Sequence, residues 1–186
     1  MIRILFLLLI LFCVGGCSSL AQQTEKMEQQ SSAQILKLLP PEQGPSPVLL
    51  KQAVTMEMSG SQHQFIAIIR LELEQVQMMA LLPTGQQLFL LEYDGKNLSQ
   101  DNYSSVEIPG KEILTIMQFA LWPESSVRQN YSEKEGWDLE FDSDQRWLKN
   151  STETFLEVKF EKDDLIVVNH QHHYKILIQT LEKKML

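Results

Sequence analysis

Three of the four histidines lie within four residues of one another, and they are the first candidates for chemistry. His170, His172 and His173 surround Gln171. On an extended strand, His170 and His172 project from the same side, as two ligands of one metal ion must. A zinc site needs at least a third protein ligand in a tetrahedral arrangement, and the neighbouring sequence supplies none. We therefore interpret the cluster as a polar turn or strand edge and predict no metal site and no cofactor.

Carboxylates form the second chemical pattern. Asp138, Glu140, Asp142 and Asp144 alternate with apolar and aromatic residues, which indicates the solvated face of a strand. Calcium-binding loops combine such acids with a turn glycine at fixed spacing, and that spacing is absent. The sequence also has no glycine-rich phosphate loop and no Gly-x-Ser-x-Gly nucleophile motif. We predict that the protein is not an enzyme.

The N-terminus has the pattern of a secretory signal that ends at a cysteine. A charged Arg3 precedes 11 apolar residues, Ile4 to Val14, and a membrane-spanning helix would need about 20. Val14-Gly15-Gly16-Cys17 resembles the lipobox of bacterial lipoproteins, which implies removal of residues 1–16 and lipidation of Cys17. Ser18 then resembles the signal for the outer membrane in Gram-negative sorting. We predict a lipid-anchored protein of the outer membrane, facing the periplasm.

Composition limits the partners of the remaining chain. The formal net charge is −8, and it becomes more negative once Arg3 is removed, so nucleic acid is an unsuitable partner. Cys13 and Cys17 are the only cysteines, so the mature domain contains no disulfide. Residues 17–46 are rich in Gln, Ser, Glu and Pro, which predicts a flexible tether with at most a helical turn at 35–39. Residues 47–186 are expected to form one folded domain.

Alternating apolar residues predict strands through most of that domain. The segments 48–58, 64–74, 76–82 and 87–93 form a first antiparallel set, because short glycine-containing turns join them. Apolar residues spaced by three and four predict one amphipathic helix over 109–121, which Trp122-Pro123 ends. Segments 137–142, 156–161, 165–168 and 174–181 predict a second set of strands. The fold class is therefore mainly β with helix cover (α+β).

The order of these elements, on a chain that begins with a lipobox, resembles the LolA and LolB superfamily of lipoprotein carriers and receptors. The residues that carry the likeness are 81–89, 92–95, 113–121 and 174–176. More narrowly, the chain is similar to an uncharacterised family of small proteobacterial lipoproteins, some of which occur with aryl-polyene lipid biosynthesis genes. The resemblance implies a curved antiparallel sheet, or incomplete β-barrel, around a hydrophobic cavity.

In that superfamily the cavity holds acyl chains. Carried over to this sequence, the implied cavity lining is Phe65, Ile69, Leu71, Leu73, Met78, Leu82, Phe89, Leu91, Ile116, Met117 and Leu121. The same apolar faces are equally compatible with a filled core, and both interpretations stay open at this stage. The turn at Pro83-Thr84-Gly85 has no exposed leucine of the kind that LolB uses for membrane insertion.

Two functions follow from these patterns. The first is a membrane-anchored protein that binds or accepts acyl chains of a lipid or a lipoprotein. Export of an envelope lipid, such as an aryl polyene, is one process in which it would act. The alternative is a non-catalytic scaffold that binds an unidentified envelope protein through acidic strand faces and exposed aromatic residues, with Trp122, Tyr131, Trp137 and Trp147 as candidates.

Overall fold

A computed structural model describes residues 36–105, 108–162 and 164–186. The predicted signal, Cys17 and the first part of the predicted tether lie outside these residues. Among the described helices, none is long and apolar enough to cross a membrane.

Ten strands form one antiparallel sheet in the order β5-β4-β3-β2-β1-β10-β9-β8-β7-β6. The two ends of the folded chain therefore meet at the centre, where β1 pairs with β10 along their whole length. The bounds of the strands are β1 Val48–Met58, β2 Ser61–Leu71, β3 Val76–Leu81, β4 Gln87–Tyr93, β5 Leu98–Asn102, β6 Asp138–Phe141, β7 Gln145–Lys149, β8 Thr154–Glu161, β9 Asp164–Asn169 and β10 Tyr174–Met185.

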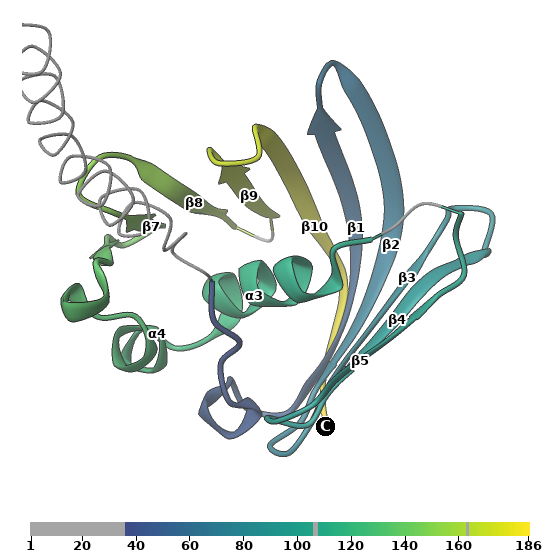
Figure 1. The fold of residues 1–186 in the computed structure, drawn as a ribbon. Helices are drawn as coiled ribbons and strands as arrows, with labels where there is room; N and C mark the ends of the chain where they lie inside the picture. The colour runs from purple at the N-terminus through teal and green to yellow at the C-terminus, as the bar shows by residue number, and fades with distance from the viewer. Residues whose placement is uncertain (1–35, 106–107, 163) are drawn as a thin grey trace, which may run out of the picture. The chain divides into compact units, whose positions relative to one another are not determined.

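Two α-helices and two short 3-10 helices complete the described part of the folded unit. Helix α3 (Gly110–Leu121) lies within the curve of the sheet, on its inner face (Figure 1). Helix α4 (Glu124–Asn130) follows Pro123, and the 3-10 helices are η2 (Pro41–Gln43) and η3 (Glu133–Glu135). The predicted fold class, mainly β with helix cover and a curved antiparallel sheet, is confirmed.

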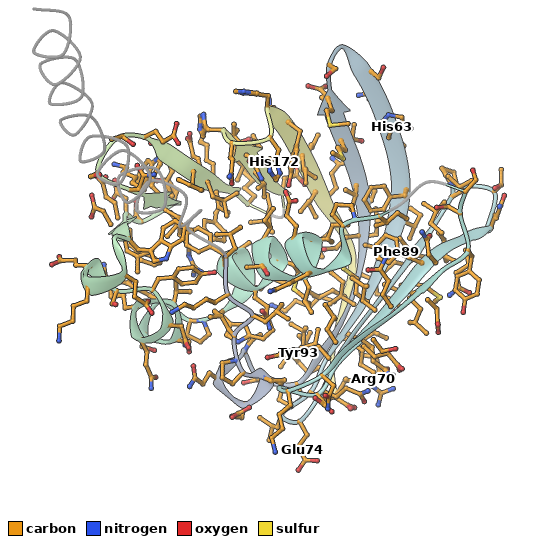
Figure 2. The ribbon with its side chains drawn as sticks, viewed as in Figure 1. His63, Arg70, Glu74, Phe89, Tyr93 and His172 are labelled. Atoms are coloured by element: carbon orange, nitrogen blue, oxygen red, sulfur yellow. The ribbon has the colours of Figure 1, made fainter. Side chains whose placement is uncertain are left out.

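The two-residue alternation of the strands separates an inner from an outer face. Along β4, Phe89, Leu91 and Tyr93 are buried on the inner face, and the residues between them are half exposed. Figure 2 shows Phe89 and Tyr93 on the same side of the sheet as α3, and Arg70 of β2 projecting away from it. The inner face therefore supplies the apolar surface that α3 covers.

The end of β2 differs from the prediction. The alternating pattern suggested a strand to residue 74, but β2 stops at Leu71 and the chain turns before β3 begins at Val76. The backbone N–H of Glu72 donates to the carbonyl of Gln75, which closes the turn. Leu73 consequently lies in the turn with 57 % of its surface exposed, because it no longer belongs to the alternating face.

A chain of aromatic rings joins α3 to the far half of the sheet. The ring of Phe119 meets Tyr131 edge-on at 6.3 Å, Tyr131 meets Trp137 at 5.6 Å, and Trp137 meets Phe155 of β8 at 5.2 Å. Tyr131, Trp137 and Trp122 are each at most 3 % exposed. The predicted exposure of these three aromatics is therefore wrong, because they fill the space between the helices and β8. Only Trp147 of the four is partly exposed.

Residues 36–46 belong to the folded unit, which begins at Leu36 rather than near residue 47. Leu39 is fully buried, and its backbone N–H and C=O both bond the side chain of Gln118, at 2.8 and 2.7 Å. The Trp122 indole N–H donates to the Pro40 carbonyl at 3.1 Å. Residues 36–40 form no helix. The prediction of a tether through residue 46 is thus wrong for this part, because side chains of α3 satisfy the backbone of an extended segment.

Candidate functional site

The inner face of the sheet is the predicted site, and most of it is packed. Six of the proposed cavity residues are buried in one core cluster with α3: Ile69, Leu71, Met78, Phe89, Leu91 and Ile116. Phe65, Met117 and Leu121 are partly buried against the same cluster, and Leu82 is partly buried at the end of β3. Helix α3 therefore occupies the middle of the inner face, so that a ligand site must lie beside the helix.

One hollow on the inner face lies beyond the C-terminal end of α3, and we call it the inner slot. Its volume is about 340 Å³. Its lining residues are Pro45, Val48, Leu50, Gln52, Leu71, Leu121, Phe160, Lys162, Asp164, Leu165, Thr180 and Lys183. Of the predicted cavity residues, only Leu71 and Leu121 are among them. The slot thus joins the N-terminal segment, the end of α3 and the strands β1, β2, β8, β9 and β10.

The walls of the inner slot come from cross-strand pairs at the centre of the sheet. Leu50 pairs with Lys183, and Gln52 pairs with Thr180. Paired residues of neighbouring strands lie on the same face, so all four side chains share the inner face. Gln52 is 3 % exposed, and its amide lies 3.5 Å from the Thr180 hydroxyl. Polar atoms are therefore present at one wall, but aliphatic and aromatic carbon forms most of the lining.

A β-bulge decides which side chains of β10 face the slot. The register between β1 and β10 shifts between Lys51 and Gln52, so that Leu181 has no partner on β1. Strict alternation from Ile178 and Thr180 would place Glu182 inside and Lys183 outside. The extra residue reverses the order beyond it, as bulges do. Lys183 consequently takes an inner position opposite Leu50, and Glu182 takes an outer position opposite Lys51.

A second hollow, the outer groove, lies at the opposite end of β1 and β10. It has a volume of about 590 Å³ and runs between the β1–β2 turn and the β9–β10 turn. Its walls include Glu57, Lys175, His170 and His173, so ionisable groups of both signs line it. Met58, 40 % exposed, is the main apolar side chain in the β1–β2 turn. The groove is therefore wider and more polar than the inner slot.

The predicted histidine cluster lies in the β9–β10 turn, and its members point to different partners. His170 Nε2 lies 3.6 Å from a carboxylate oxygen of Glu157, whereas His172 Nδ1 lies 2.8 Å from Oε1 of Glu112. His172 is labelled in Figure 2. His170 and His172 therefore do not converge as the metal hypothesis required. Among the residues that the structure describes, no three His, Cys, Asp or Glu side chains are arranged to hold a metal ion.

The carboxylate of Glu112 fastens the first turn of α3 to the β9–β10 turn. Its Oε1 accepts a hydrogen bond from the Tyr174 hydroxyl at 2.7 Å and one from the Asn169 amide at 3.1 Å. Burial of the Tyr174 phenol, and then its bond to Glu112, raise the pKa of that hydroxyl, so it stays a neutral donor. These contacts fix the N-terminal end of the helix.

Arg146 of β7 fastens the other end of α3. One guanidinium nitrogen donates to the Phe119 carbonyl at 2.9 Å and to the Trp122 carbonyl at 2.7 Å. Cations are favourable at helix C-termini, where the last carbonyls lack helical partners. The guanidinium also lies over the rings of Phe141 and Phe160, at 5.5 and 5.1 Å from their centres. The helix end that carries Leu121 into the inner slot is therefore held in place.

Gln52, Thr180, Lys162 and Lys183 line the inner slot but were not among the predicted site residues. The alternation of Val48, Leu50 and Val54 along β1 places Gln52 on the inner face, and its pairing places Thr180 there too. A polar residue within an otherwise apolar face could therefore have marked both positions in the sequence. Lys183 could not be found in this way, because its inward position depends on the bulge.

Comparison with solved structures found chains that are similar to this one at low sequence identity. A LolA superfamily protein from Nitrosomonas europaea is 8 % identical over 79 % of this chain and 90 % of that one, with a TM-score of 0.43. A putative outer membrane lipoprotein-sorting protein domain from Vibrio parahaemolyticus is 9 % identical over 86 % and 91 %, with a TM-score of 0.39. No curated protein gave a significant match. The model of the family described as "Protein of unknown function (DUF3261)" matches residues 49–182, and the chain belongs to that family.

Proposed function

We propose that this domain binds a single acyl chain in the inner slot, as the folded part of a lipid-anchored periplasmic protein of the outer membrane. The observation that carries the proposal is the apolar slot beside α3, which Val48, Leu50, Leu121, Phe160 and Leu165 line. An acyl chain needs no specific partner atoms, since its binding free energy comes from removing methylene groups from water.

The volume of the slot sets the size of the ligand. Sites for small organic molecules range over about 300–1,000 Å³, and the slot, at about 340 Å³, is near the small end. It suits part of one acyl chain, and not the two chains of a phospholipid or the three of a processed lipoprotein. The sequence resemblance to lipoprotein carriers supports acyl binding in general, whereas the slot favours a single-chain ligand.

The predicted anchor defines how such a domain works. A chain that is lipidated at Cys17 stays at one membrane, because two or more acyl chains give stable anchoring. It therefore does not carry cargo between membranes. We propose that it acts as a stationary acceptor or accessory site, which takes a single-chain lipid from another component or from the membrane beside it.

The test is photochemical labelling of the full chain in vesicles with a photoactivatable fatty acid, followed by mapping of the labelled peptides. We expect labels on peptides from the start of β1, the end of α3 and the end of β10.

A matched pair of variants locates the site. Thr180→Trp places a large ring in the inner slot, whereas Lys184→Trp places the same ring on the exposed outer face of the same strand, opposite Leu49. The first should abolish labelling of the slot peptides, and the second should leave it unchanged. Equal labelling of both variants, or labels spread without preference over the surface, would exclude the inner slot as the acyl site.

A further inference from the structure

The inner slot has positive charge at its edge, although the protein as a whole is acidic. Lys162 and Lys183 both line it, and the formal net charge of the chain is −8. Asp164 is the one carboxylate that the described residues contribute to the lining, so two ammonium groups face one carboxylate among these residues. Within the described residues, neither lysine forms an ion pair, whereas Lys37, Lys149 and Lys159 each pair with a glutamate.

Two local irregularities of the backbone bring these lysines to the slot. The β-bulge at Leu181 turns Lys183 to the inner face, opposite Leu50. Lys162 lies in the β8–β9 turn with a φ of 53°, a left-handed conformation that residues with a side chain rarely adopt. Both departures from regular geometry place an ammonium group beside apolar walls, where bulges and strained residues are frequently functional.

The carboxylate in the lining is already engaged. The Asp164 Oδ2 lies 3.5 Å from the amide nitrogen of Gln179, which belongs to the outer face of β10. Asp164 and Gln179 are paired across the two strands, so the carboxylate is directed towards the outer face while Lys183 is directed inward. The register therefore directs the Asp164 carboxylate away from Lys183, and the lysine ammonium groups can take an anionic ligand group at the edge of the slot.

Resting on the proposed function, we infer that the ligand of the inner slot is a single-chain amphiphile with an anionic headgroup, and that Lys162 and Lys183 bind this headgroup. The apolar walls take the chain, and the two lysines hold a carboxylate or phosphate at the edge through charge-assisted hydrogen bonds. Neutral single-chain lipids of the same length lack this second contact and are discriminated against.

The experiment uses the full chain in phosphatidylcholine vesicles and three photoactivatable probes of equal chain length. One is a fatty acid, one is its methyl ester and one is a lysophosphatidic acid. We expect the acid and the phosphate probe to label the slot peptides at concentrations about ten-fold lower than the ester does. The stronger of the two anionic probes identifies which headgroup the site prefers.

Variants of single lysines assign the effect to these residues. Lys162→Gln and Lys183→Gln should each weaken labelling by the anionic probes about three- to ten-fold and leave labelling by the ester unchanged. Lys184→Gln is the matched control, because Lys184 follows Lys183 on the same strand but pairs with Leu49 on the outer face. It should change nothing.

The outcomes separate this inference from the proposed function. If all three probes label the slot equally well, or if the lysine variants weaken the ester as much as the acid, acyl binding stands and the headgroup assignment falls. If no probe labels the slot peptides, both fall. All these variants are single exposed side chains, so their folding is checked by the urea midpoint, which should equal that of the unmodified chain.

Discussion

Replacing Gln118 by leucine should detach the N-terminal segment from α3. Gln118 is fully buried, and its side-chain amide makes two bonds to one residue: Oε1 accepts from the Leu39 N–H, and Nε2 donates to the Leu39 carbonyl. Leucine has nearly the same volume but no polar atoms. The substitution therefore leaves a buried backbone donor and a buried acceptor of Leu39 without partners.

The magnitude follows from those two groups. An unsatisfied buried polar group costs about 1–3 kcal/mol, so two cost about 2–6 kcal/mol if nothing relaxes. Relaxation of the extended segment into water, and relief of the amide's own desolvation, bring the expected loss to about 2–3 kcal/mol. With a urea m-value of about 2 kcal/mol/M, the unfolding midpoint falls by about 1–1.5 M.

Two measurements check the reasoning. Urea denaturation gives the loss of unfolding free energy, and hydrogen exchange at the Leu39 amide reports whether the segment has separated from the helix. Gln179→Leu, an exposed residue of β10, is the control and should change stability by less than about 0.5 kcal/mol. If Gln118→Leu behaves like this control and the Leu39 amide stays protected, the segment is held by contacts other than the Gln118 amide.

Three further outcomes follow from single groups. Leu39→Ala should lower the unfolding free energy by about 2–5 kcal/mol in urea denaturation, because Leu39 is fully buried. Burial raises the pKa of Tyr131 from 10.0 to about 12. Its contribution to stability should be complete below pH 10 and should fall by about 2–3 kcal/mol as the pH rises to 12. Tyr131→Phe should remove that part of the alkaline loss in unfolding free energy, and the part from Tyr174, whose pKa is also raised, should remain. Hydrogen bonds from the backbone of Asn97, then its side chain, and from Lys96 lower the pKa of Asp94 from 3.8 to about 2, so its contribution to stability is present above pH 3.8 and is lost as the pH falls through 2. NMR titration of the Asp94 carboxyl carbon measures that pKa directly, and a midpoint near 4 would contradict the turn geometry.

The central strands could be predicted because burial on one face imposes a period of two. The predicted segments 48–58 and 87–93 match the bounds of β1 and β4. β5 and β7 were not predicted. β5 is an edge strand of sequence Leu-Ser-Gln-Asp-Asn with four exposed residues. Because neither of its faces is buried, its sequence has no alternation of apolar and polar residues from which a strand could be predicted. Helix α4 was also missed, because its seven residues are mostly polar and only Ser126 and Val127 are buried.

The N-terminal segment shows where composition misleads. Residues 36–46 contain enough Gln, Glu and Pro to predict a tether, but stability depends on where individual side chains and carbonyls find partners. Leu39, Pro40 and Lys37 find theirs at Gln118, Trp122 and Tyr131, which lie far along the chain. No local pattern encodes such contacts.

Only the apolar walls of the inner slot could be predicted, because its remaining features also depend on contacts between distant parts of the chain. The apolar inner faces of β1 and β2 follow from the period of two in the sequence. The volume that remains beside α3 depends on how closely the helix packs against the sheet, which the sequence pattern does not show. The inward turn of Lys183 depends on one unpaired residue, Leu181. A one-residue change of register reverses every side chain beyond it, and the sequence around Leu181 contains no glycine or proline to mark it.

The attachment of α3 finally limits what the domain can bind. Leu121 lines the inner slot, so a larger ligand would have to displace the C-terminal end of the helix. That movement breaks both Arg146 bonds to the carbonyls of Phe119 and Trp122, and the bond from Trp122 to Pro40. At about 1–3 kcal/mol for each buried group left unpaired, a ligand must recover on the order of 5 kcal/mol from additional contacts before the open form is populated. Under the proposed function, a single chain that fits the existing slot avoids this cost, and the anchoring of α3 by Arg146 would then favour ligands of one chain.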